Sequence, residues 1–258
     1  MIANYHTHTA RCGHARGKER EYIEYAIERG VKILGFSDHA PQYFTDDYES
    51  RIRMGTDALE NYAQTVLALK TEYASDIAIH LGLEVEYYPA IFEVLVQHAR
   101  DCGVEYFLLA QHYLGNEVGE KYTSVPREEP AFLKRYCQQV IEAMDTGMFT
   151  YLAHPDLVRD MGAPEVFEEE MRKLCRAANR NHLPVEINLL GVRDERHYPN
   201  EAFWRIAGEE GCQVVLGADA HAPEDVCEPE DVRKAMRLVE KYGLQLLETV
   251  ELKNVAIL

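Results

Sequence analysis

Short apolar segments rich in β-branched and aromatic residues alternate along the chain with longer segments whose apolar residues recur at helical spacing. This alternation is typical of repeated βα units that build a mostly parallel sheet. We therefore predict an α/β fold. The pattern places seven strands near residues 2–6, 33–37, 78–85, 106–111, 150–153, 184–188 and 213–217.

The segments between these strands carry helix signals. Asp57 and Glu60 stand three residues apart before an apolar stripe and predict a capping box at the start of a helix. Glycine after a periodic segment predicts a left-handed residue at a helix C-terminus. The stripe consists of Leu59, Tyr62, Ala63, Val66 and Tyr73, and the glycines are Gly30, Gly147, Gly211 and Gly243.

The chain shows no sign of a division into domains. No linker rich in Pro and Ser interrupts it, and no block of like charges separates one part from another. We therefore expect residues 1–258 to form a single domain. Two long connections, 40–55 and 113–129, follow the second and fourth predicted strands, and loops of this length are commonly lids or binding elements.

The charge balance narrows the range of partners. The chain has 27 Lys and Arg against 44 Asp and Glu, a net charge of −17, so we expect no nucleic-acid partner. A small anionic substrate would need strong local positive charge, which metal ions would provide. No apolar run approaches the roughly 18 residues that span a bilayer, and the start lacks the features of a signal peptide. We expect a cytoplasmic protein without a membrane partner, and its oligomeric state stays open.

The six cysteines are scattered singly and form no CxxC pair. In a chain of this size, that spacing favours reduced thiols over disulfides or a zinc site with Cys ligands. Cys12 alone lies near candidate chemistry. Nothing beside it in the sequence lowers the pKa of a thiol, so we interpret Cys12 as a bystander.

The first candidate chemistry stands at the start of the chain, in the segment Asn4-Tyr5-His6-Thr7-His8. Residues i and i+2 of a strand point to the same face, so His6 and His8 can reach one metal ion. A catalytic metal usually takes at least three protein ligands. The remaining ligands must therefore come from elsewhere in the chain.

Ligand-type side chains also stand where five further predicted strands end. In a closed barrel of parallel strands, these ends meet at one face. A single His at a strand end is more often a hydrogen-bonded structural residue, but imidazoles crowded around buried carboxylates favour a bound cation. We therefore predict metal ligands there and in the loop after the first strand, namely His14, His39, Glu84, His112, His154, Asp219 and His221.

With these motifs, the chain resembles the polymerase-and-histidinol-phosphatase (PHP) superfamily of metal-dependent phosphoesterases, and most of all its monofunctional bacterial histidinol-phosphatases. The resemblance runs from His6 to about His221. It implies a distorted, TIM-like seven-stranded (β/α) barrel with three divalent metal ions. It assigns His6, His8, Glu84 and Asp219 to one metal, His112 and His154 with bridging Glu84 to the second, and His14, His39 and His221 to the third.

Imidazole and carboxylate ligands suit Zn²⁺, Mn²⁺ or Fe²⁺. Closely spaced metals can turn a bridging water into a hydroxide nucleophile and neutralise phosphate oxygens. The resemblance thus implies hydrolysis of L-histidinol phosphate to L-histidinol and phosphate, in histidine biosynthesis, with Glu84 and Asp219 in the catalytic centre. The alternatives are a PHP phosphoesterase for another small phosphate monoester or nucleotide, and a non-catalytic PHP scaffold, which would have no physical reason to keep a costly charged cluster.

Two arginines resemble phosphate-binding residues of histidinol-phosphatases, and we assign both to catalysis and substrate binding. Arg159 follows the fifth predicted strand, and Arg193 follows the sixth, which supplies no metal ligand. A guanidinium can grip phosphate through two hydrogen bonds. The alternative is a surface ion pair, because acidic residues adjoin both arginines. We also expect Asp38, Asp156 and Glu186 to orient a His ligand or to protonate the leaving group.

Overall fold

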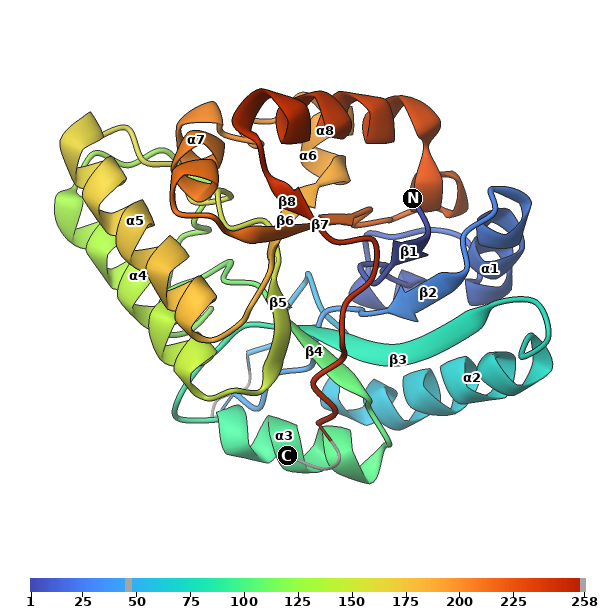
Figure 1. Ribbon diagram of the computed structural model, residues 1–258. Helices are drawn as coiled ribbons and strands as arrows, with labels where there is room; N and C mark the ends of the chain where they lie inside the picture. Colours follow the sequence, from blue (N-terminus) through green and yellow to red (C-terminus); the bar gives the residue numbers. More distant parts are fainter. Residues whose placement is uncertain (45–47, 256–258) are drawn as a thin grey trace.

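The computed structural model describes residues 1–44 and 48–255 and is an α/β fold on one curled parallel sheet (Figure 1). Each strand lies beside its neighbour in the chain, as expected for consecutive βα units. The strands of the described residues are β1 (Ala3–Asn4), β2 (Ile33–Phe36), β3 (Ala78–Val85), β4 (Tyr106–Leu109), β5 (Phe149–Leu152), β6 (Val185–Asn188), β7 (Gln213–Gly217) and β8 (Gln245–Leu246).

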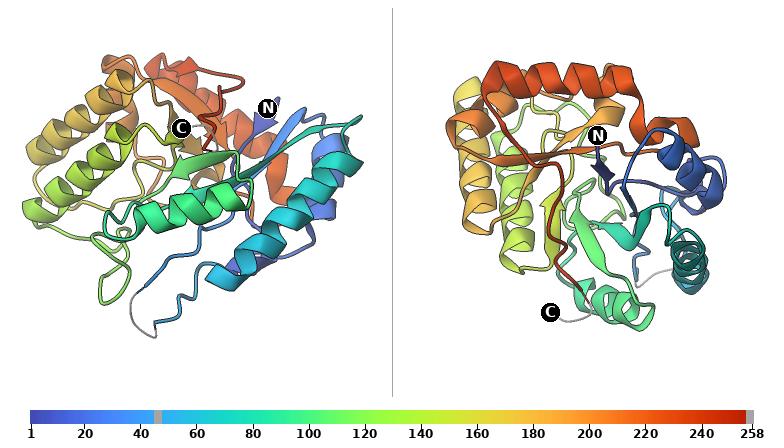
Figure 2. Two further views of the ribbon diagram at one scale, coloured as in Figure 1. Left: turned by 90° about the horizontal axis from the view of Figure 1, so that it is seen from below. Right: turned by 45° about the vertical axis from the view of Figure 1, so that its right-hand side comes forward.

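The helices surround the sheet on its outer side (Figures 1 and 2). No helix in the described part of the chain is long and apolar enough to cross a membrane. The α-helices are α1 (Glu19–Glu28), α2 (Leu59–Glu72), α3 (Phe92–Asp101), α4 (Pro130–Asp145), α5 (Pro164–Arg180), α6 (Leu189–Arg193), α7 (Glu201–Glu209) and α8 (Pro229–Tyr242), and the short 3₁₀ helices are η1 (Ala10–Cys12), η2 (Thr56–Ala58) and η3 (Pro223–Cys227).

The sequence pattern located the first seven strands, but the count of seven was wrong, because the described residues contain an eighth. Strand β8 pairs with β7 through Gln213↔Gln245 and Val214↔Leu246. Two residues are too few for an alternating pattern to stand out in the sequence. The two ends of β7 therefore have different neighbours, since β8 contacts only its N-terminal half.

The C-terminal end of β7 meets the end of β1. The His8 amide donates to the Ala220 carbonyl at 2.9 Å, and the Ala220 amide donates to the His6 carbonyl at 3.2 Å. Thr7 and Ala220 form an isolated parallel bridge. These contacts place the histidine pair at the start of the chain beside the residues that follow β7.

Side chains that point into the curled sheet form a small core of their own, whose buried members include Tyr5, Tyr106 and Tyr151. The ring of Tyr106 needs a glycine on β2, because a Cβ atom at Gly35 would lie 2.1 Å from its hydroxyl oxygen. The segment 247–255 then crosses the sheet at the N-terminal ends of its strands and packs three apolar side chains on this core (Figure 1). They are Leu247, Val250 and Leu252.

The predicted capping box was wrong. Helix α2 begins at Leu59 with Ala58 as its N-cap, and no side chain caps it. Residues 56–58 form η2 instead, which places Asp57 inside a 3₁₀ turn rather than before a helix. The four predicted C-terminal glycines do adopt positive φ angles, as a left-handed residue after a helix requires.

Candidate metal centre

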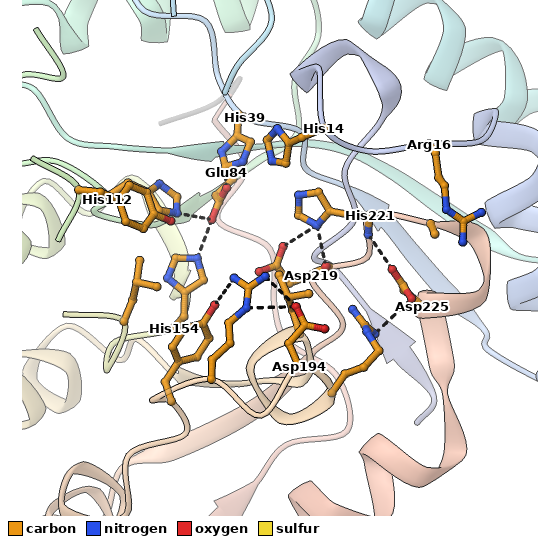
Figure 3. A pocket seen from close by; sticks show the side chains of 17 residues that line it. His14, Arg16, His39, Glu84, His112, His154, Asp194, Asp219, His221 and Asp225 are labelled. Carbon is orange, nitrogen blue, oxygen red and sulfur yellow. Dashed lines mark hydrogen bonds and ion pairs between the residues drawn. The ribbon is translucent and has the colours of Figure 1, made fainter. Parts of the chain in front are cut away.

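The strand ends bring the predicted ligands together at the mouth of the curled sheet. A cavity of about 440 Å³ opens there. His6 and His8 lie fully buried beneath it, against the carboxylates that line it. Figure 3 shows the imidazoles converging on Glu84 and Asp219. The predicted ligands that line the cavity are His14, His39, Glu84, His112, His154, Asp219 and His221.

Glu84, near the end of β3, is the centre of this cluster. Its Oε2 lies 2.7 Å from Nδ1 of His39, and its Oε1 lies 2.9 Å from Nε2 of His154. The same Oε1 is 3.3 Å from Nε2 of His6 and 3.8 Å from Nε2 of His112. Burial alone would raise the pKa of Glu84, but the surrounding imidazoles hold it well below its usual value. Glu84 is therefore an ionised carboxylate shared by imidazoles from four strand ends.

Asp219 forms the second acidic position. Its Oδ1 lies 3.0 Å from Nε2 of His8, 3.6 Å from Nε2 of His6 and 3.5 Å from Nδ1 of His221. Asp219 and His154 have φ angles of 47° and 28°, which are costly for residues with a side chain. Two strained residues in one cluster are typical of a functional site, where the position of the side chains offsets the cost of the backbone strain.

The geometry groups the ligand atoms into sets that could hold an ion. Within the described residues, each set has its atoms within 4.8 Å of one another. His112 belongs to none of these described sets, although it lies near Glu84. One set is the complete third predicted site, a second contains three of the four ligands predicted for the first site, and a third joins Glu84 to one ligand from each of its two predicted sites. The three are His6, His8 and Asp219; His14, His39 and His221; and His6, Glu84 and His154.

Buried atoms of the cluster fit a cation. Among the described residues, Nε2 of His6, His8 and His221 and Oε2 of Glu84 make no hydrogen bond of regular geometry, and all but the His221 nitrogen have ion-pair contacts within the cluster. Buried polar atoms are nearly always satisfied, so these four mark a place where a partner is expected. Imidazole nitrogen and carboxylate oxygen together suit a divalent transition metal.

Acidic side chains hold the rear nitrogen of three of these imidazoles. Nδ1 of His6 lies 2.8 Å from Glu186 Oε2, and Nδ1 of His8 lies 3.4 Å from Asp38 Oδ1. Both carboxylates were expected in this role. The third is Glu86, whose Oε1 lies 3.0 Å from Nδ1 of His112.

Our sequence reading missed Glu86. A signal existed, because Glu84 and Glu86 are two residues apart in an extended segment and share a face.

Asp156 was predicted to orient a His ligand. Its carboxylate instead accepts hydrogen bonds from the Trp204 indole at 2.9 Å and from the Asn200 amide at 2.6 Å. Burial raises the pKa of Asp156 to about 6. Its contacts connect the loop after β5 to the start of α7.

The imidazoles differ in charge in the metal-free protein. Burial alone would lower the pKa of His8, but the contacts with the carboxylates of Asp219 and Asp38 outweigh it and raise the pKa to about 9. Burial, followed by the charge of His8, lowers the pKa of His221 to about 4. Neutral His221 has a free lone pair at pH 7, whereas His8 must lose a proton before it can bind a metal.

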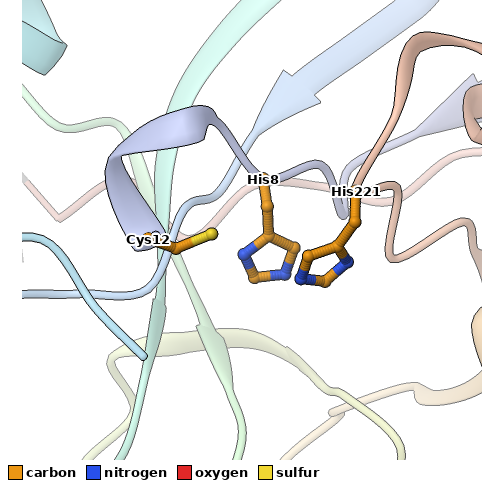
Figure 4. A group of neighbouring side chains, drawn as sticks. All are labelled: His8, Cys12 and His221. Carbon is orange, nitrogen blue, oxygen red and sulfur yellow. The ribbon is translucent and has the colours of Figure 1, made fainter. Parts of the chain in front are cut away.

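Cys12, at the end of η1, lies beside the cluster, as its place in the sequence suggested. Its sulfur and one nitrogen each from His8 and His221 lie within 4.8 Å of one another (Figure 4). Burial raises the pKa of the Cys12 thiol to about 12. A bound metal would itself lower the pKa of this thiol, so the role of Cys12 as a bystander stays a prediction.

The two predicted arginines occupy different surroundings. Arg193, at the end of α6, lines the cavity, with Nη1 3.5 Å from both Asp225 Oδ1 and Asp231 Oδ2. Its two terminal nitrogens have no hydrogen-bond partner among the described residues. Arg159 is exposed and is not among the described residues that line the cavity. Arg16 and Arg196 line it and were not predicted, although each follows a predicted residue by two or three positions.

Known proteins share this arrangement of strands. The model of the PHP domain family matches residues 4–189. The chain belongs to the PHP domain family. This confirms the resemblance seen in the sequence motifs.

Curated relatives of this PHP chain include the probable histidinol-phosphatase of Deinococcus radiodurans, 28% identical over 87% of this chain and 88% of that protein. The histidinol-phosphatase of Bacillus subtilis is 26% identical over 86% of this chain and 94% of its own length. The fold matches a crystal structure of histidinol phosphate phosphatase from Lactococcus lactis, complexed with zinc, L-histidinol and phosphate. That match has a TM-score of 0.74 and 19% identity and covers 97% of both chains.

Proposed function

We propose that this PHP protein is a metal-dependent phosphomonoesterase that hydrolyses L-histidinol phosphate to L-histidinol and phosphate. One observation carries the proposal: imidazoles with buried nitrogens that make no regular hydrogen bond surround two carboxylates, Glu84 and Asp219, at an open cavity. The substrate is supported by the curated relatives named histidinol-phosphatase, which align with most of this chain.

We further propose three divalent ions, held by the nine residues predicted from the sequence. Zinc is supported by the donor set and by its presence in the Lactococcus lactis structure, and manganese and iron suit the same donors. Bound ions would supply Lewis-acid charge and acidify a water at neutral pH. Ionised Glu84 and Asp219 would then offset part of the metal charge.

The cavity suits a small phosphorylated molecule. Arg193 lines it with two terminal nitrogens that make no hydrogen bond, although Nη1 is ion-paired with Asp225 and Asp231, and a guanidinium can bind phosphate through two hydrogen bonds. Tyr122 and Tyr198 line the same cavity and can contact the organic part of a substrate. The net charge of −17 would repel a polyanion, so a nucleic acid is a less suitable substrate than a small phosphate ester. The absence of nucleic-acid and membrane partners and the cytoplasmic location stay predictions.

A kinetic screen on metal-analysed protein tests the proposal. Protein stripped with a chelator and reloaded with zinc or manganese would be assayed on histidinol phosphate, on sugar phosphates, on nucleoside monophosphates and on a phosphodiester. We expect turnover of histidinol phosphate only after metal is restored, and none of the phosphodiester. Preference for another monophosphate would keep the phosphatase but replace its substrate. Protein that binds no metal and is inert on every monoester would indicate the scaffold alternative.

A further inference from the structure

Arg53 lies buried between two carboxylates outside the metal cluster. Its Nη2 is 2.5 Å from Glu86 Oε2 and 2.8 Å from Glu117 Oε2. Its Nε donates to Glu117 Oε2 at 2.9 Å, and its Nη1 donates to the Ala40 carbonyl at 3.2 Å. Arg53 is only 5% exposed, and both carboxylates are buried as well. The guanidinium thus contacts partners from three separate segments: it donates hydrogen bonds to Glu117 and Ala40 and forms an ion pair with Glu86.

One of these partners leads directly to the proposed metal centre. The second oxygen of Glu86 lies 3.0 Å from Nδ1 of His112. When a carboxylate accepts the Nδ1 proton of an imidazole, Nε2 is left with its lone pair free. In His112, that Nε2 lies 3.8 Å from Oε1 of Glu84 and faces the cluster. Arg53, Glu86 and His112 therefore form a continuous line of contacts.

The other partner leads to the two long loops noted in the sequence. Arg53 belongs to the loop 40–55, of which residues 45–47 lie outside the described residues. Glu117 belongs to the loop 113–129. Oε1 of Glu117 also accepts hydrogen bonds from the Tyr48 hydroxyl at 2.8 Å and from Ser50 Oγ at 2.7 Å. The contacts of Glu117 therefore hold the two loops together.

The loop 113–129 also touches His112 directly. The rings of Tyr122 and His112 stack with centroids 5.4 Å apart and an interplanar angle of 19°. The Thr123 amide donates to the His112 carbonyl at 2.8 Å. His112 is thus held at its ring face by one loop and at Nδ1 by Glu86, which the other loop holds through Arg53.

We propose that Arg53 is a positioning residue: through Glu86 it holds the His112 ring with Nε2 toward Glu84, and through Glu117 it makes that orientation depend on the two loops. The inference rests on the proposed metal centre. A simpler reading is a buried ion pair with a structural role. Such pairs contribute little net stability, and their replacement by apolar groups of similar volume is often neutral. Metal affinity separates the two readings, because an ion pair with only a structural role would not change it.

The experiment compares metal affinity with stability in a set of single variants. Arg53→Met keeps an unbranched apolar stem and removes the guanidinium with its charge, Arg53→Lys keeps the charge, and Glu86→Gln keeps the shape of the carboxylate. Zinc affinity would be measured by competition with a chromophoric chelator, and stability by chemical denaturation of the metal-free protein. Cobalt-substituted protein adds an absorption spectrum that reports ligand geometry.

We expect Arg53→Met and Glu86→Gln to weaken the binding of one ion by about 10- to 100-fold and to change the cobalt spectrum, as loss of a group that orients a ligand does. Arg53→Lys should restore part of the affinity. Lys70→Met is the matched control, because it breaks the Lys70–Glu105 ion pair of 2.6 Å away from the site and should leave metal affinity unchanged. If Arg53→Met does not fold, Glu86→Gln tests the same step.

His112→Ala separates the failure of this inference from failure of the metal centre. Normal zinc affinity in His112→Ala would overturn the role of His112 as a ligand, and the inference with it. Weakened affinity in His112→Ala together with normal affinity in both Arg53→Met and Glu86→Gln would overturn only the positioning role. Glu117→Gln tests the loops: we expect a smaller loss of affinity than in Arg53→Met, and no loss would remove the dependence on the loops.

Discussion

A Cβ atom at position 217 would lie 2.1 Å from Oε2 of Glu186, so Gly217 leaves the space that this carboxylate fills. The same oxygen lies 2.8 Å from Nδ1 of His6. Gly217 ends β7 and Glu186 belongs to β6, and these neighbouring strands point the carboxylate toward β1. A missing side chain on one strand therefore permits the contact that orients a proposed ligand on another.

Gly217→Ala should displace Glu186 and release the His6 ring. We expect zinc affinity to fall by about 10- to 100-fold, as for other losses of a group that orients a ligand. Overpacking of this kind should also lower the free energy of unfolding by about 1–3 kcal/mol. Gly30→Ala is the control, because its φ of 76° strains alanine while a Cβ atom there meets nothing within 4 Å. Normal metal binding in Gly217→Ala would contradict the prediction.

Glu84→Gln removes the charge shared by five imidazoles and keeps the shape of the side chain. We expect turnover to fall by at least about 10³-fold, comparable with loss of a principal electrostatic group in other active sites. Metal content should fall as well, while the circular dichroism spectrum keeps its native form. Asp219→Asn should behave in the same way. Turnover near that of the unmodified protein in either variant would rule out the proposed centre.

The two arginines can be separated by kinetics. Arg193→Ala should raise KM for the phosphomonoester at least about tenfold with metal content preserved, because a charged hydrogen bond to phosphate contributes roughly 1.5–3 kcal/mol. Arg159→Ala should change KM less, since the Arg159 side chain is exposed outside the described wall of the cavity. Steady-state kinetics with inorganic phosphate as inhibitor would measure both. Equal effects would restore Arg159 as a substrate-binding residue.

Metal binding should release protons. In the metal-free protein the pKa of His8 is about 9, so its ring is protonated at pH 7.5 and must lose that proton to bind a metal. We expect the apparent zinc affinity to rise about tenfold per pH unit per proton released, up to about pH 9. Calorimetry in buffers with different ionisation enthalpies measures the proton count. Binding without proton release would show that His8 is not a ligand.

The shifted pKa values of His8 and His221 together should favour the metal-free fold most near pH 6.5. The raised pKa of His8 stabilises the fold below pH 6.5, and this contribution is lost as pH rises through about 9. The lowered pKa of His221 acts in the opposite sense. Its contribution to stability is fully present above pH 6.5 and is lost as the pH falls from 6.5 through about 4. Denaturant titrations of metal-free protein between pH 4 and 9 would measure both limbs. A profile that stays flat through neutrality would contradict these charge states.

Local patterns in the sequence predicted much of this site. Strand ends can be read from apolar runs, and a parallel sheet brings them to one face, so periodicity and residue chemistry were enough to choose the candidate ligands at those ends. Glu86 was overlooked because the strand periodicity puts it on the same face as Glu84 without showing that His112, which follows the neighbouring strand, comes within hydrogen-bond distance of it. Asp156 contacts Trp204 rather than an imidazole, because the partner depends on how α7 packs behind the loop.

By itself, the sequence determined the alternation of strands and helices, the identity of the donor atoms and their placement at strand ends, because these depend on short-range periodicity and on residue chemistry. The tertiary structure decided everything that depends on distance: Glu84 between His39 and His154, Gly217 beneath Glu186, and Arg53 joining two loops to Glu86. Such contacts join residues far apart in the chain, and only the closure of the sheet, through the pairing of β1 with the end of β7, sets their separations.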